Sequence, residues 1–160
     1  MASVHDVASY ILDKQGSIST WKLQKLAYYS QAWHLVWAEK PLFQDRIEAW
    51  ANGPVAPVLY SQHRGQFSVS KWRKGDSTRL DDREVETIDR VLESYGGLSG
   101  KQLVALTHNE APWLQARVGL SDTEPSQNQI TPESMAAFYL AVDGSDEAIP
   151  IDEIDWDSLG

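Results

Sequence analysis

The chain has 160 residues, of which 42% are hydrophobic, and a formal net charge of −9. This length suits one domain, which buries about 70% of its unfolded surface and so gains a core without covalent cross-links. The absence of cysteine excludes disulfide bonds, and no apolar run approaches the ~18 residues of a membrane-spanning helix. No basic segment followed by an apolar one opens the sequence, so we expect an unprocessed cytoplasmic protein without a membrane partner.

The negative charge is concentrated in the C-terminal quarter. Residues 1–117 contain all 14 Lys and Arg against 13 Asp and Glu, whereas residues 118–160 contain 10 acids and no base. Contacts to phosphate require clustered Lys and Arg, and the one short basic group, at residues 71–74, is explained by a solvated loop. Nucleic acid is therefore an unfavourable partner for this chain.

Two helices are predicted in the first quarter of the chain. Ser3 and Asp6 have the spacing of a capping box before an apolar stripe, and Gly16 ends that helix. A second helix is predicted over residues 22–37, where core positions recur at i, i+3, i+4 and i+7. Its stripe, which should face the core, consists of Leu23, Leu26, Ala27, Ser30, Trp33, His34 and Trp37.

A sharp corner follows the second helix. Asn52-Gly53-Pro54 predicts a turn, and Pro54 is expected at or just before the first position of a new helix that carries Leu59 and Tyr60. Beyond it, alternation around Phe67 favours a short local hairpin within residues 65–80. Four more helices are predicted from periodicity and cap residues: 82–95, 99–106, 112–117 and 131–139.

These elements predict a mainly α fold. We expect one compact domain of six to seven helices over residues 1–142, with one short β-hairpin or strand pair, and an acidic tail at residues 143–160. The tail combines seven acids with apolar residues. It is interpreted either as a solvated segment or as an arm that orders on a basic partner. In the second case its anchors include Ile151, Ile154 and Trp156.

No established catalytic motif is present in the sequence. There is no glycine-rich phosphate loop, no cysteine nucleophile and no zinc-binding helix, and the four histidines lack the spacing of metal ligands. We therefore predict no catalytic residue, no cofactor and no metal. A candidate buried polar cluster is formed by His34, Glu48 and His108, which are interpreted first as hydrogen-bonded core residues.

The segment LTHNEAPWLQAR, residues 106–117, has two interpretations. In the structural one, Thr107 or Asn109 caps the helix that follows. Trp113 then enters the core, and Arg117 pairs with an acid. In the functional one, a single polar-rimmed pocket is lined by His108, Glu110, Trp113 and Arg117.

Several of these motifs, taken in order, carry a resemblance to a known family. They are KLQKLAYYSQAWHLVW, PLFQDRIEAWANGPVAPVLY, Tyr95-Gly96, Leu98-Ser99-Gly100 and LTHNEAPWLQAR. Over residues 4–140 the chain resembles the Panacea domain of SocA-like, phage-associated antitoxins. The resemblance implies a mostly helical antitoxin that neutralises a cognate protein toxin by direct contact. In the SocA-like branch it also implies a proteolytic adaptor that delivers the toxin to a AAA+ protease.

The residues by themselves also favour a binding protein over an enzyme. The predicted contact residues are Trp50, Pro54 and Tyr60 on the helical body, together with the apolar residues of the tail. The alternative is a small enzyme with an unrecognised His/Glu pocket, which would require His34, Glu48 and His108 to meet in one cleft. A DNA-binding repressor would require a basic recognition helix, which the sequence lacks.

Overall fold

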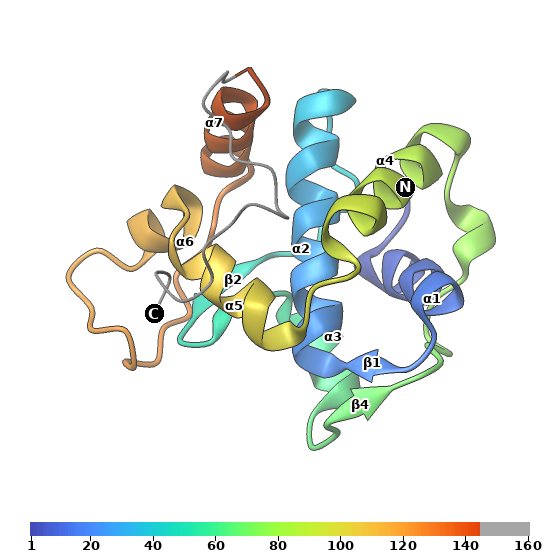
Figure 1. Cartoon of the computed structure of the whole chain (residues 1–160), viewed down its shortest axis with the longest axis horizontal. Helices are drawn as coiled ribbons and strands as arrows, with labels where there is room; N and C mark the ends of the chain where they lie inside the picture. Colours follow the sequence, from blue (N-terminus) through green and yellow to red (C-terminus); the bar gives the residue numbers. More distant parts are fainter. Residues whose placement is uncertain (145–160) are drawn as a thin grey trace.

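The computed structural model describes residues 1–144 and is built around one central helix, α2 (Thr20–Trp37). Within these residues the chain forms seven α-helices, one 3-10 turn and two sheets of two short strands. The predicted mainly α fold is therefore confirmed. In Figure 1, α1 (Val4–Gln15) and α4 (Asp82–Tyr95) lie on one side of α2, and α5 (Gly100–His108), α6 (Ala111–Ala116) and α7 (Pro132–Asp143) lie on the other.

Helix α2 is buried on almost every side, although the sequence predicted burial of one stripe. Thirteen consecutive or near-consecutive residues from Thr20 to His34 are buried, because α1, α4, α5 and α7 all pack against the helix. The polar residues between the stripe positions therefore also lie inside the molecule. A buried polar side chain must find a hydrogen-bond partner, and this requirement determines much of the surrounding structure.

The predicted helix starts are confirmed where local side chains can satisfy the first backbone amides. Ser3 and Asp6 form the capping box of α1, and Asp81 and Glu84 form the equivalent box of α4. The Ser19 side chain accepts from the backbone of Lys22 at the start of α2. The same role is played by Ser99 in α5 and Thr131 in α7.

The corner at Pro54 differs from the prediction. Pro54 lies in β3 (Gly53–Val55), which pairs with β2 (Glu48–Trp50) in an antiparallel hairpin, and α3 (Pro57–His63) begins three residues later. Two prolines were available to start the helix, and Pro57 takes the first position. The turn at Ala51 and Asn52 allows β2 and β3 to pair, so Pro54 is held in extended backbone.

The local hairpin predicted around Phe67 is wrong. Strand β4 (Ser68–Val69) pairs instead with β1 (Ile18–Ser19), about fifty positions earlier in the chain, with Ile18 opposite Val69. Alternation along one strand indicates the strand but not its partner. The pairing closes the lower side of the molecule beside the start of α2 (Figure 1).

The expected caps of α6 are also wrong. The N-cap is Glu110, without a side-chain bond, while Thr107 donates to Val104 and Asn109 donates to Ala105 within α5. Arg117 pairs with no acidic side chain of residues 1–144. Its guanidinium donates to the carbonyls of Ala49, Ser121 and Glu124, because three backbone acceptors converge at this point.

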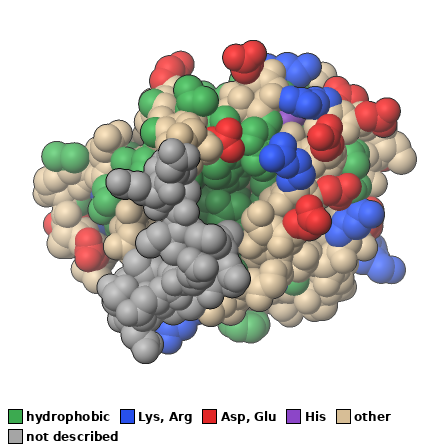
Figure 2. Space-filling view, turned by 45° about the horizontal axis from the view of Figure 1, so that its top comes forward, with side chains coloured by type: hydrophobic (Ala, Val, Ile, Leu, Met, Phe, Trp, Pro, Cys, Tyr) green, Lys and Arg blue, Asp and Glu red, His purple; other side chains and the backbone are tan. Residues whose placement is uncertain are grey.

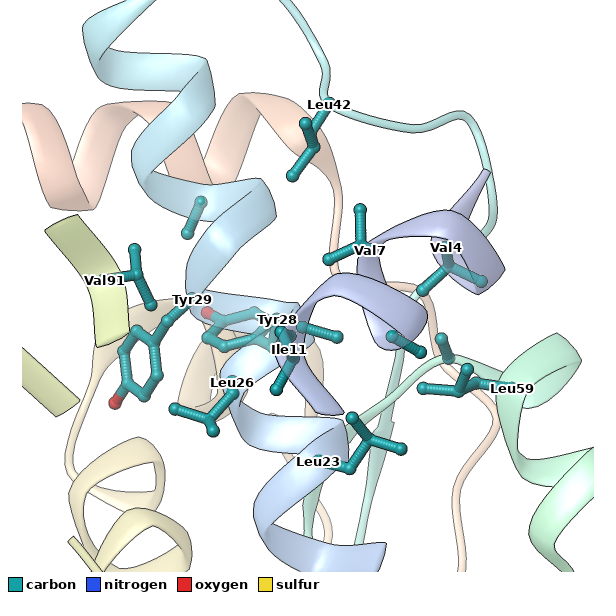
Figure 3. Packing of buried hydrophobic residues seen from close by; sticks show 14 of the residues in the cluster. Val4, Val7, Ile11, Leu23, Leu26, Tyr28, Tyr29, Leu42, Leu59 and Val91 are labelled. Carbon is teal, nitrogen blue, oxygen red and sulfur yellow. The ribbon is translucent and has the colours of Figure 1, made fainter. Parts of the chain in front are cut away.

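The core is a continuous cluster of side chains from every helix. Figure 3 shows residues of α1, including Val7 and Ile11, facing Leu23 and Leu26 of α2, with Leu59 of α3 alongside. The aromatic side of the cluster contains Trp33, Tyr95, Tyr139 and Trp113, all buried. Trp37, predicted to be a core residue, is only half-buried, and the Arg90 guanidinium lies 3.7 Å from its ring centroid.

One face of the molecule places a group of charges beside apolar side chains. Figure 2 shows hydrophobic side chains gathered in a recess, with most of the Lys, Arg, Asp and Glu side chains of this face on the right of the view. Helix α4 is strongly amphipathic, with most of its acids and both arginines exposed and Ile88 and Val91 fully buried. Among the helices of residues 1–144, none combines the length and the apolar character needed to cross a membrane.

Candidate functional site

A hollow of about 320 Å³ lies beside the N-terminal half of α2. Its walls come from α2, from the β2–β3 hairpin, and from α3 with the loop that follows it. We call it the central hollow. Its lining residues are Thr20, Trp21, Gln24, Lys25, Trp50, Asn52, Val55, Tyr60, His63, Gly65 and Gln66.

Two more hollows adjoin the central one and share residues with it. Trp21 also borders a hollow of about 350 Å³ that includes Phe67 and Lys101. Trp50 and Asn52 also border one of about 340 Å³ that includes residues 125–127. The three hollows are therefore connected through shared lining residues, and we call the surface that they make up the aromatic strip. The start of α2, the β1–β4 pair and the β2–β3 hairpin, which contribute to it, lie in the lower part of Figure 1.

The aromatic strip exposes large apolar rings. Trp21 is 49% exposed and Phe67 is 86% exposed, while Trp50 and Tyr60 are half-buried. The Trp50 and Tyr60 rings pack edge to face with centroids 4.9 Å apart. Rings of this kind, held in place by neighbours and still accessible, are typical of protein contact sites.

The hairpin wall of the strip is fixed from behind. The Trp50 Nε1 donates to Glu48 Oε1 at 2.9 Å, and the Trp50 carbonyl accepts from Trp113 Nε1 at 2.8 Å. Residues 128–130 run beside β2, where Ala49 N donates to the Asn128 carbonyl. The Trp50 ring is therefore presented by a rigid support and not by a free loop.

Gln24 of α2 contacts the segment that joins the hairpin to α3, and it fixes the protonation state of His63 in α3. The Ala56 amide donates to Gln24 Oε1 at 2.9 Å, so the Gln24 Nε2 must face His63 Nε2, also at 2.9 Å. Because Nε2 of Gln24 can only donate, the His63 Nε2 must be an unprotonated acceptor. Burial lowers the pKa of His63, in agreement with a neutral ring.

Lys25 lies at the floor of the central hollow with 1% of its surface exposed. Its Nζ donates to the Pro54 carbonyl at 3.1 Å. Burial lowers the pKa of Lys25 from 10.5 to about 7. Gly53 is required beside it, because its φ of +108° suits glycine and a Cβ there would lie 2.5 Å from the Lys25 Cε.

The predicted contact residues have different positions in the structure. Trp50 and Tyr60 both line the central hollow, whereas Pro54 is buried in β3 and contributes its carbonyl to Lys25. Ile151, Ile154 and Trp156 lie outside the described residues. Trp21, Phe67 and Lys25 were missed, since no motif distinguishes an exposed aromatic or a buried lysine within a helix from its neighbours.

The three members of the candidate polar cluster have separate partners. His34 Nδ1 lies 2.8 Å from Thr87 Oγ1, between α2 and α4. Glu48 accepts from Arg46 and Trp50 beside the hairpin. The His108 ring stacks on Trp113 with centroids 4.0 Å apart, and the Arg117 guanidinium lies 5.0 Å from the same tryptophan centroid. Within residues 1–144, no hydrogen bond joins any two of the cluster residues.

Glu110 belongs to a different group, which sequence reasoning missed. Its Oε1 accepts from Tyr29 at 2.6 Å and from Tyr139 at 2.8 Å, and the Tyr139 hydroxyl lies 3.1 Å from that of Tyr28. The carboxylate therefore links α2 to the start of α6 and to α7. Burial raises the pKa of Glu110 to about 7, although the two tyrosine hydroxyls act in the opposite direction.

Metal ligation is not indicated in the described part of the chain, where no three His, Asp or Glu side chains converge. The central hollow instead offers one buried ammonium, a neutral imidazole, an amide and several aromatic faces. Such a set can bind and orient a group that enters the hollow. Among the described residues that line this hollow, no hydroxyl or thiol is paired with a base as an activated nucleophile would be.

Comparison with known proteins identifies the family. Residues 23–114 match the family described as antitoxin SocA-like, Panacea domain. Antitoxin SocA of Caulobacter vibrioides (strain NA1000 / CB15N) is 36% identical over 124 residues, which cover 67% of this chain and 66% of that relative, just under two thirds of its length. No solved structure gives a significant match. The chain belongs to the SocA-like Panacea family of antitoxins.

The position of Glu110 predicts a specific pH dependence of stability. Folding raises the pKa of Glu110 from 4.5 to about 7. The contribution of Glu110 to the free energy of unfolding is therefore complete below the pKa of the unfolded chain and is lost as the pH rises through the pKa of the folded protein. We expect Glu110→Gln to remove this loss, which amounts to about 3 kcal/mol at most. Urea unfolding of both proteins at several pH values between about 5 and 8 measures it.

Glu133→Gln is the matched control, because Glu133 is exposed in the first turn of α7. This variant should follow the pH profile of the unmodified chain. Parallel profiles for Glu110→Gln and the unmodified chain would contradict the assignment of the titration to Glu110.

Proposed function

We propose that the chain neutralises a cognate protein toxin by binding it directly, with the aromatic strip as the contact surface on the helical body. The observation that carries the proposal is the continuity of three hollows through shared, partly exposed tryptophans. Membership of an antitoxin family supplies the biological role. The match to that family includes most of α2, the hairpin and α3, which form the walls of the central hollow.

The chemistry of the strip supports a protein partner. Tryptophan, tyrosine and phenylalanine rings dominate its rim, and such residues contribute most of the binding energy in protein interfaces. A chain with a net negative charge repels the phosphate groups of nucleic acid, so nucleic acid is not the proposed ligand. Neutralisation by contact also needs no catalytic turnover.

The first test replaces the most exposed rings of the strip. Trp21→Ala and Phe67→Ala should each weaken binding of the toxin encoded beside this chain by about 10-fold to 100-fold, because an interface tryptophan or phenylalanine contributes roughly 1.4–3 kcal/mol. Folding should be retained, since both rings are already largely in water. Calorimetry gives the affinity, and growth rescue in cells expressing the toxin gives the function.

Val118→Ala is the control, because Val118 is 81% exposed and lies outside the strip. Its affinity should stay within about two-fold of the unmodified chain. Unchanged affinity in both strip variants would place the contact surface elsewhere. Failure of the unmodified chain to bind the toxin or to rescue growth would contradict the proposed function itself.

We further propose that residues 143–160 form an arm that contacts the toxin. Six acids and no base lie beyond Gly144, and this charge would accelerate encounter with a basic toxin while Ile151, Ile154 and Trp156 slow its release. Truncation after Gly144 keeps α7 complete. It should weaken binding and flatten its salt dependence, because exposed charges are screened over about 8 Å at physiological ionic strength. Equal affinities at low and high salt for both proteins would eliminate the arm.

Delivery of the toxin to a AAA+ protease is a further step that we propose for this chain. Direct binding alone should leave the half-life of the toxin unchanged or lengthen it, because a bound protein is protected from unfolding. Delivery should shorten the half-life only when the chain is present. Following the toxin after synthesis is stopped, with and without the chain and with the Trp21→Ala variant, separates the two mechanisms. A half-life that the chain does not shorten would contradict the adaptor role and leave neutralisation by binding intact.

A further inference from the structure

Among residues 1–144, the side chain at the floor of the central hollow is a buried lysine amine without a counter-ion. Lys25 has three N–H donors and one hydrogen bond, to the Pro54 carbonyl. No Asp or Glu of residues 1–144 lines the hollow, and the two ion pairs in this part of the chain involve arginines elsewhere. The histidines that face Lys25 are His63 of α3 and His108 of α5, and burial first, with the charge of Lys25 in addition, lowers the pKa of each ring.

A structural role alone does not account for a lysine at this position. Burial of an ammonium without a paired anion is unfavourable, and an apolar side chain of similar length would fill the same space without that cost. The surroundings are nevertheless built to admit it. Gly53 leaves room for the Lys25 side chain, and the extended backbone at Pro54 directs a carbonyl toward its Nζ.

We propose that the central hollow is a carboxylate-binding site, in which Lys25 pairs with an Asp or Glu side chain of the protein partner. This inference rests on the proposed function and adds a chemical requirement for the partner. A volume of about 320 Å³ accommodates such a side chain. Asn52, Tyr60 and Gln66 add polar groups along its walls.

The location of the hollow argues for a side chain of a bound protein. It lies in the middle of the aromatic strip, so a partner that covers Trp21 and Trp50 also seals the hollow from water. A carboxylate would then supply both the missing charge and the missing acceptors. A partner without a carboxylate would bury the Lys25 amine without water and without an acceptor, so such a partner should bind less well. The site therefore contributes specificity more than affinity.

The first experiment tests the site without any toxin. The full chain is titrated with propionate and, as a matched neutral control, with propionamide, while the Lys25 side-chain signal is followed by carbon-13 NMR. The signal is assigned by its loss in Lys25→Met. Propionate should raise the titration midpoint of Lys25 by about one pH unit, because a bound carboxylate stabilises the charged form. Equal effects of propionate and propionamide, or no effect of either, would overturn the proposal.

The second experiment uses the toxin encoded beside this chain. At about pH 8 the free Lys25 amine is mostly neutral, so pairing with a carboxylate should take up a proton on binding. Calorimetry in two buffers of different ionisation enthalpy measures that proton. Neither His63 nor His108 contributes, because both rings are neutral at this pH. Lys25→Met should lose the proton uptake and bind about 10-fold more weakly, whereas Lys71→Met, at an exposed lysine outside the strip, should do neither.

The outcomes distinguish this inference from the proposed function. Tight toxin binding without proton uptake, and with equal affinity for Lys25→Met, would overturn the carboxylate site and leave the antitoxin role intact. Absence of toxin binding would contradict the proposed function, and the propionate titration would still decide whether the hollow recognises a carboxylate.

Discussion

The burial of α2 on almost every side is the constraint on which the rest of the structure depends. The polar side chains of a helix that is surrounded by other elements must find their hydrogen-bond partners in those elements. Each such hydrogen bond fixes the position of one neighbouring element. Gln24 holds the junction between β3 and α3, and Gln31 binds the backbone of Leu42 and Phe43 through three hydrogen bonds. Tyr29 in turn holds the start of α6 through Glu110. The helix is thus both the core and the template for its surroundings.

The candidate site follows from this arrangement. Gln24 and Lys25 are consecutive residues of α2, and their side chains reach opposite ends of the short segment from Pro54 to Ala56. That segment joins the hairpin to α3, so two walls of the central hollow are attached to the same turn of one helix. A wall attached in this way loses little conformational freedom when a partner binds, which preserves affinity.

Local patterns made the helices predictable, and non-local contacts made the remainder unpredictable. Caps such as Ser3 with Asp6 and Ser99 with Gln102 act over three residues, so both helix starts were foreseen from the sequence. The pairing of Ile18 with Val69 depends on how the intervening helices pack, and no local signal encodes it. The site shows the same division. Trp50 and Tyr60 were expected from their motif, whereas Lys25 becomes unusual only when the hairpin closes over it.

Exposed and buried residues of the site differ in how freely they can vary. The Trp21 and Phe67 side chains lie largely in water, so their replacement changes the contact surface at little cost in folding free energy. Replacement of Gln24 would leave the Ala56 amide and the His63 ring without their partners, and any side chain at Gly53 would meet Lys25. A scaffold of this kind can keep its buried frame while its rim adapts to partners of different shape. The exposed side chains of the surface then determine which partner is recognised, while the buried residues determine how those side chains are oriented.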